Sequence, residues 1–93
     1  MGDEIFDDTE LRVTSGDYEA RLRWYIWEIF EDDKYITRLN PFWKENRFYI
    51  IEEMERLGIK IDRRLSECDR IEDFVKTKNC GRFILREYKR SLK

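Results

Sequence analysis

Two short sequence signals mark the ends of one helix more clearly than the ends of any other element of this chain. Asn40 directly before Pro41 is typical of an N-cap followed by a proline at the first helical position, where the missing N–H is not needed. Gly58, with an apolar residue on each side, is typical of the position just beyond a helix end. The sequence therefore predicts a helix over 41–57.

Three further segments have the apolar spacing of amphipathic helices. Ser15 is a suitable N-cap for a helix over 16–31. Ser66, with an acidic residue three positions later, predicts a capping box at the start of a helix over 67–78. An Asn-Cys-Gly sequence then ends that helix, and 82–92 forms the last one.

These elements predict an all-α fold, a compact bundle of about four helices, with room for one short β segment near 10–14 or 59–63. A chain of 93 residues has length for one core, so we expect a single helical domain over 16–93. Residues 1–15 are rich in Asp and Glu without helical periodicity, and are expected to form a mobile acidic arm.

The predicted helix 16–31 carries two apolar stripes, whereas a surface helix normally carries one. Such a helix is either sandwiched in the core or offers its second stripe, with Trp24 and Trp27, to a partner. Aromatic residues make up 15% of the chain, and Trp and Tyr dominate the energetics of protein interfaces. The aromatic residues that fit the predicted core faces least, and are our candidates for partner binding, are Trp24, Trp27, Phe42 and Tyr49.

Charge is segregated along the chain although the total is only −2. Residues 1–33 hold eleven acids and three bases, residues 34–59 hold four acids and five bases, and residues 60–93 hold six acids and eleven bases. Three interpretations compete. The acidic end covers the basic end in the same molecule; or opposite ends steer two copies, or a partner, together; or the basic end meets phosphates.

Much of the basic charge falls on one arc of the predicted helix 82–92. The order helix, short turn, basic helix is the outline of a helix-turn-helix unit, whose second helix enters the major groove of DNA. The candidate nucleic-acid contacts are Arg82, Arg86, Lys89, Arg90 and Lys93 on that arc, with Arg63 and Arg64 before it. Any two amphipathic helices joined by a glycine turn share this outline.

The residue inventory argues against catalysis and against a structural metal site. Histidine is absent, which removes Cys–His and Ser–His nucleophile pairs. Two cysteines, Cys68 and Cys80, are too few for a structural zinc site. A disulfide between them is open in an oxidising compartment, and free thiols are favoured in a reducing one. We expect no enzymatic activity, no cofactor and no bound metal.

The sequence thus favours a non-catalytic protein-interaction module, a small regulator, inhibitor or adaptor that binds a protein partner or a second copy of itself. The alternative is a nucleic-acid-binding domain of helix-turn-helix type that uses the basic C-terminal helix. No apolar run is long enough to span a membrane, so no membrane association is expected. We expect a cytoplasmic location, with the nucleus as the alternative.

Overall fold

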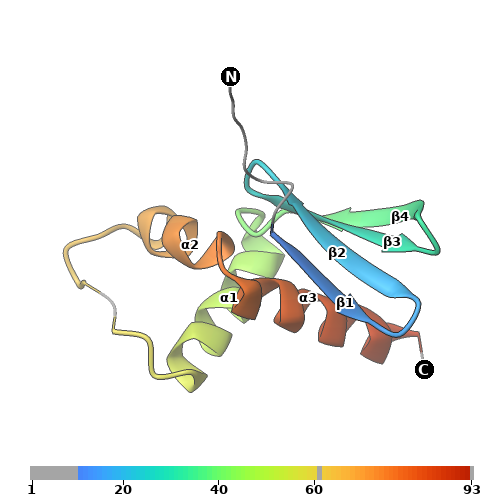
Figure 1. The fold of residues 1–93 in the computed structure, drawn as a ribbon. Coiled ribbons are helices and arrows are strands. Elements are labelled where there is room, and N and C mark those ends of the chain that lie inside the picture. The colour runs from blue at the N-terminus through green and yellow to red at the C-terminus, as the bar shows by residue number, and fades with distance from the viewer. Residues whose placement is uncertain (1–10, 61, 93) are drawn as a thin grey trace.

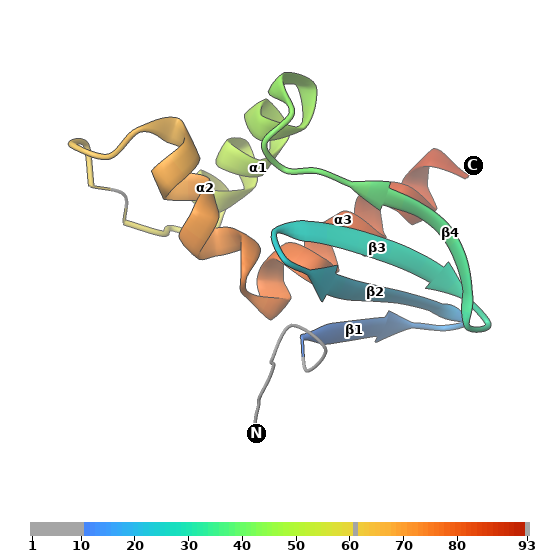
Figure 2. The ribbon, with the colours of Figure 1, turned by 90° about the horizontal axis from the view of Figure 1, so that it is seen from above.

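The computed structural model describes residues 11–60 and 62–92, which form a four-stranded antiparallel sheet followed by three helices (Figure 1, Figure 2). The strands lie side by side in chain order, so each pairs with the next through a short turn. The elements are β1 (Arg12–Ser15), β2 (Tyr18–Arg23), β3 (Ile26–Glu31), β4 (Lys34–Leu39), α1 (Lys44–Arg56), α2 (Glu67–Val75) and α3 (Lys78–Ser91).

The prediction of an all-α bundle is wrong, because the first half of the described chain is a sheet and the fold is α+β. The segment 16–31, predicted as one helix, is the β2–β3 hairpin. Alternate residues of a strand share a face, and the buried residues of the two strands follow this period of two. They come from both stripes of the predicted helix and lie together on one sheet face: Ala20, Leu22, Trp27 and Ile29.

The turns explain why the hairpins escaped the sequence patterns. Gly16, between β1 and β2, has a φ of 64°, which glycine adopts at no steric cost. Trp24, between β2 and β3, has a φ of 60°, in a position that hairpins usually give to Gly or Asn. Asp32 and Asp33, between β3 and β4, have φ values of 51° and 67°, as the common two-residue hairpin turn requires. Only the first turn carries a glycine.

The other three predicted helices are present with shifted ends. The helix predicted over 41–57 is α1, but the predicted N-cap is wrong: α1 begins three residues later, with Trp43 at its N-cap, and the side chain of Asn40 accepts from the N–H of Phe42 instead. The predicted capping box of α2 is confirmed, with Ser66 and Asp69 bonding to each other's backbone N–H. The predicted stop at Asn-Cys-Gly is wrong, since those residues form the first turn of α3. Thr77 is the N-cap of α3, and its side-chain oxygen accepts a hydrogen bond from the N–H of Cys80 at 3.2 Å.

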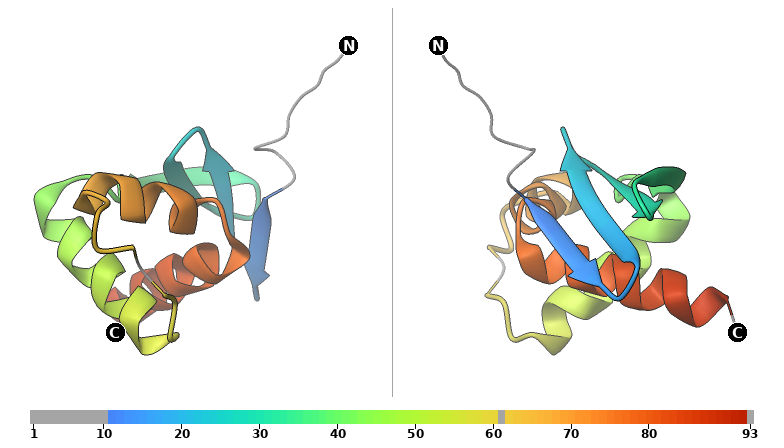
Figure 3. Two further views of the ribbon diagram at one scale, coloured as in Figure 1. Left: turned by 90° about the vertical axis from the view of Figure 1, so that its left-hand side faces the viewer. Right: turned by 45° about the vertical axis from the view of Figure 1, so that its right-hand side comes forward.

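One face of the sheet is covered by α3, which lies along β1 and β2 (Figure 3). The approach is close at Gly81, where an added Cβ would lie 2.7 Å from Cγ2 of Val13 and 2.8 Å from the ring of Trp27. Trp27 is fully buried, and its indole N–H donates to the carbonyl of Val75 at 3.0 Å. The core therefore forms where the sheet meets α2 and α3, and Ile50 and Met54 of α1 complete it.

The structure also tests the predicted short β segments and part of the predicted N-terminal arm. The short β segment allowed near 10–14 corresponds to β1, whereas the described residues of 59–63 form no strand. Arg12–Ser15, which we expected in a mobile arm, belongs to the sheet. Residues 1–10 of that predicted arm lie outside the described residues, as does Lys93.

Candidate functional site

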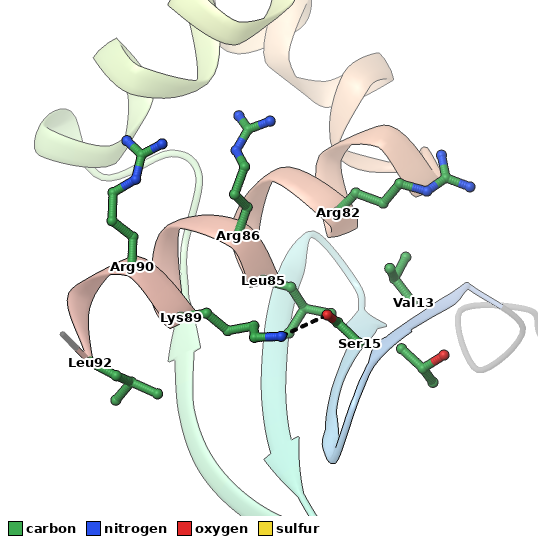
Figure 4. Close-up of a pocket in the computed structure, with 9 residues that line it drawn as sticks. Val13, Ser15, Arg82, Leu85, Arg86, Lys89, Arg90 and Leu92 are labelled. Atoms are coloured by element: carbon green, nitrogen blue, oxygen red, sulfur yellow. Dashed lines mark hydrogen bonds between the residues drawn. The ribbon is translucent and has the colours of Figure 1, made fainter.

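A groove with a volume of about 690 Å³ lies between β1 and α3 (Figure 4). Its walls are three consecutive residues of the strand and one side of the helix. We call it the basic groove. Its lining residues are Val13, Thr14, Ser15, Arg82, Leu85, Arg86, Lys89, Arg90 and Leu92, with four cationic side chains and no carboxylate among them.

Helical spacing brings the cations of the basic groove together. Arg82, Arg86 and Arg90 follow one another at intervals of four residues, which places them on one side of α3. The opposite side of the same helix is the core face, with Ile84 fully buried. The amphipathic pattern of the sequence therefore predicts this arc correctly as a helix face.

The four cations of the basic groove differ in what neutralises them. Arg86 donates to Glu53 of α1 at 3.0 Å, and Arg90 lies 3.5 Å from the carboxylate of Glu87. In Figure 4 both side chains point away from β1. Their charge is therefore partly offset within the fold, by carboxylates that lie outside the groove.

The two remaining cations have neutral hydrogen-bond partners. Lys89 reaches across to β1 and donates to the hydroxyl of Ser15 at 2.9 Å. Arg82 donates to the side-chain carbonyl of Asn79 at 3.0 Å. A carboxylate that replaces such a neutral acceptor adds the attraction between opposite charges to the hydrogen bond. Arg82 and Lys89 are therefore the groups in the groove best placed to gain from an incoming anion.

The floor between these cations is apolar. Leu85 is buried beneath them, Val13 is half-buried, and Leu92 at the end of α3 is 54% exposed. A ligand that fits this groove has both negative charge and apolar surface.

The other residues proposed for nucleic-acid contact lie elsewhere. Arg63 and Arg64 are in the connector between α1 and α2 and do not line the basic groove. Arg64 is bound to Asp62 through its side chain at 3.0 Å, and these hydrogen bonds lower the pKa of the Asp62 carboxyl. Lys93 lies outside the described residues, as do the acids of residues 1–10 that we considered as a cover for the arc.

The structure does not gather the four predicted partner-binding aromatics into one exposed patch. Trp27 is in the core. Phe42 is half-buried and packs against the core, and the ring centroid of Phe42 lies 5.8 Å from that of Tyr25. Trp24 is 73% exposed in the β2–β3 turn, and Tyr49 is 57% exposed on α1. Trp24 and Tyr49 are therefore the two of these side chains that a partner can reach.

The strand wall of the basic groove is the part that sequence reasoning missed. Val13 and Ser15 come from a segment assigned to a mobile arm, and although a short β segment was allowed near 10–14, nothing in the sequence placed it beside the last helix. The signal available in the sequence was the alternation of apolar Leu11 and Val13 with polar Arg12 and Thr14, which the burial of alternate residues in β1 follows. Four residues are too few for that alternation to stand out.

The described residues offer no arrangement for metal chemistry. No group of three or more Cys, Asp or Glu side chains that could hold a metal ion occurs within 11–60 and 62–92. Cys68 is exposed and Cys80 is buried, and both thiols are free.

None of the helices between residues 44 and 91 is long and apolar enough to cross a membrane. No protein-family model, no curated protein and no solved structure matches this chain.

Proposed function

We propose that this protein is a non-catalytic interaction module that binds an acidic segment of a partner protein in the basic groove. The observation that carries this proposal is the combination of four cationic side chains with an apolar floor in a groove that no carboxylate lines. Carboxylates of the partner bind Arg82 and Lys89, and its apolar side chains cover Val13 and Leu85. Trp24 and Tyr49 offer exposed aromatic surface for further contacts.

Charge and floor together favour a protein ligand over nucleic acid. The affinity for a phosphate backbone rises with the number of cations that contact it, and phosphate groups gain nothing from contact with an apolar floor. The chain has a net charge of −2, and two of the four cations already bond to Glu53 or Glu87. An acidic peptide with apolar residues uses both properties of the groove.

The test is a binding titration with a short fluorescent peptide in which Glu and Leu residues are mixed. Two matched peptides carry Gln in place of Glu, or Ser in place of Leu. We expect the mixed peptide to bind more tightly than either, and its affinity to fall with salt as surface charges are screened.

Variants locate the binding. Arg82→Gln combined with Lys89→Gln is expected to weaken binding of the mixed peptide by about tenfold or more, which corresponds to about 1.4 kcal/mol. The matched control combines Lys34→Gln with Lys44→Gln, two exposed lysines outside the groove, and should bind like the unmodified protein. Equal binding by both double variants would overturn the proposal.

Nucleic-acid binding is the second candidate, favoured by the order of α2 and α3. Only Lys76 and Thr77 separate these helices, and α3 presents its arginines in one row. Each phosphate contact contributes about −0.9 to the slope of log affinity against log salt for duplex DNA. Tight binding of a mixed-sequence duplex with such a slope, lost in the groove variant, would replace the peptide proposal with this one.

A further inference from the structure

A second cavity, separate from the basic groove, lies where α2 faces the end of α1 and the connector between them. Its volume is about 270 Å³. Arg70, Asp73 and Phe74 reach it from α2, at intervals that place them on one face of that helix, and Thr77, the residue that caps α3, lies beside them. Met54 of α1 closes the other side.

The floor of this cavity is apolar and belongs to the core. Met54 is 2% exposed and Phe74 is 3% exposed. Ile59 and Leu65 of the connector form the outer apolar wall and are partly exposed. Burial of a ligand's apolar body against these four side chains removes apolar surface from water on both sides of the contact.

Arg70 supplies an unsatisfied cationic donor at the same place. Its Nε is buried and has no hydrogen-bond partner, the one such side-chain nitrogen or oxygen found among the residues that the structure describes. Native proteins satisfy nearly all their buried polar groups, and an exception calls for an explanation such as an absent ligand. An arginine side chain carries a positive charge in proteins, so the Arg70 donor favours an anion as its partner.

The acids beside the cavity do not neutralise Arg70. Asp62 is held by Arg64, whose side chain donates to both carboxylate oxygens. Asp73 lies on the next turn of α2, and no ion pair joins it to Arg70 within the described chain. Arg70 also lines a neighbouring cavity of about 450 Å³ with Lys60, Arg63 and one acid, Glu55. With Asp62 neutralised by Arg64, the two cavities are lined by three further cations, Lys60, Arg63 and Arg70, and by two acids, Asp73 and Glu55, which leaves one net positive charge around Arg70.

We propose that the cavity between α1 and α2 binds a small carboxylate that has an apolar body. The carboxylate accepts from a terminal nitrogen of Arg70, and the planar pairing that guanidinium groups make with carboxylates is completed when the side chain turns its covered Nε toward the ligand. The apolar body lies on Met54 and Phe74. The volume is just below the range of about 300–1,000 Å³ typical of drug-sized ligands, so the expected ligand is a compact one such as an arylalkanoate. This site is independent of the basic groove.

The test uses phenylpropanoate as the probe and nuclear magnetic resonance as the readout. In the unmodified protein we expect it to shift the Nε–H signal of Arg70 and the methyl signal of Met54. Phenylpropanamide has the same apolar body without the charge, acetate has the charge without the body, and inorganic phosphate is an anion of another geometry. Each of these is expected to bind at least about tenfold more weakly.

Two substitutions separate the role of Arg70 from a general loss of folding. Arg70→Gln should weaken phenylpropanoate binding by about tenfold or more, whereas Arg38→Gln, which removes an exposed arginine on β4, should not change it. Because the unmodified protein is itself mapped by its signal shifts, the proposal stays testable if Arg70→Gln does not fold. Equal binding of the amide, equal binding of phosphate, shifts confined to the basic groove, or no binding at millimolar probe would each overturn it.

Discussion

The indole N–H of Trp27 donates a 3.0 Å hydrogen bond to the main-chain carbonyl of Val75, and so ties the middle of the sheet to the last residue of α2. The bond is buried, and Trp27 is the largest of the fully buried side chains. It joins two elements that are 48 residues apart in the chain. The sheet and the helices therefore share one core at this point.

Trp27→Phe removes both the volume of the indole and the donor, and leaves the carbonyl of Val75 buried without its partner. We expect the free energy of unfolding to fall by about 2–4 kcal/mol. Chemical denaturation followed by circular dichroism measures the change. Trp43→Phe is the control, since Trp43 is 54% exposed and its replacement should cost about 0.5 kcal/mol or less. Equal losses in the two variants would contradict the structural assignment of Trp27.

Gly81→Ala tests the close approach of α3 to the sheet. The new Cβ would meet Val13 at 2.7 Å and two ring carbons of Trp27 at 2.8 and 2.9 Å, closer than real Cβ contacts come. Alanine normally stabilises a helix interior relative to glycine, so the sign of the effect is informative. We expect a loss of about 1–3 kcal/mol in thermal or chemical unfolding. A stabilised Gly81→Ala protein would show that α3 does not lie this close to β1 and β3.

Glu53→Gln tests the link between α1 and α3. The Glu53 side chain is 6% exposed and accepts from Arg86 at 3.0 Å and from Arg56 at 3.1 Å. Both arginines are more than a third exposed, which reduces the cost of losing the charge. We expect a loss of about 1–2 kcal/mol in chemical denaturation. Glu52→Gln, on the exposed side of the same helix, should be nearly neutral.

Stability should also fall at alkaline pH because of the Cys80 thiol. Burial raises the pKa of Cys80 to about 12, opposed in part by a hydrogen bond with Trp27, whereas the ordinary value is about 9. The unfolded chain therefore releases the thiol proton first. The stabilisation of the folded state that comes from this pKa difference is fully present below about pH 9 and is lost as the pH rises toward about 12.

Urea unfolding across that pH interval measures this contribution as a slope. One proton changes the free energy of unfolding by at most about 1.4 kcal/mol per pH unit. Cys80→Ala should show a shallower decline than the unmodified protein, whatever its overall stability. Cys68→Ala, which replaces the exposed thiol, should keep the original slope. An unchanged slope in Cys80→Ala would refute the assignment.

The C-terminal half of the fold, and the helical wall of the basic groove, were accessible from the sequence. Gly58 and the Ser66–Asp69 box act through their own backbone and their near neighbours, so they locate helix ends without knowledge of the rest of the chain, whereas Pro41 lies three residues before the first helical residue of α1. The same local logic placed Arg82, Arg86, Lys89 and Arg90 on one arc, which α3 presents in the groove.

Local spacing alone determined the helices and the basic arc, whereas tertiary structure decided the sheet and both cavities. In segment 16–31 the apolar residues satisfy a helix and a hairpin alike, and the turn at Trp24 has no glycine or asparagine to separate the two. Pairing with β1 and β4, and burial of Trp27 against Val75, select the hairpin. The contact between Trp27 and Val75 joins residues 48 apart in the chain, so its free energy depends on the assembled core and leaves no local pattern in the sequence.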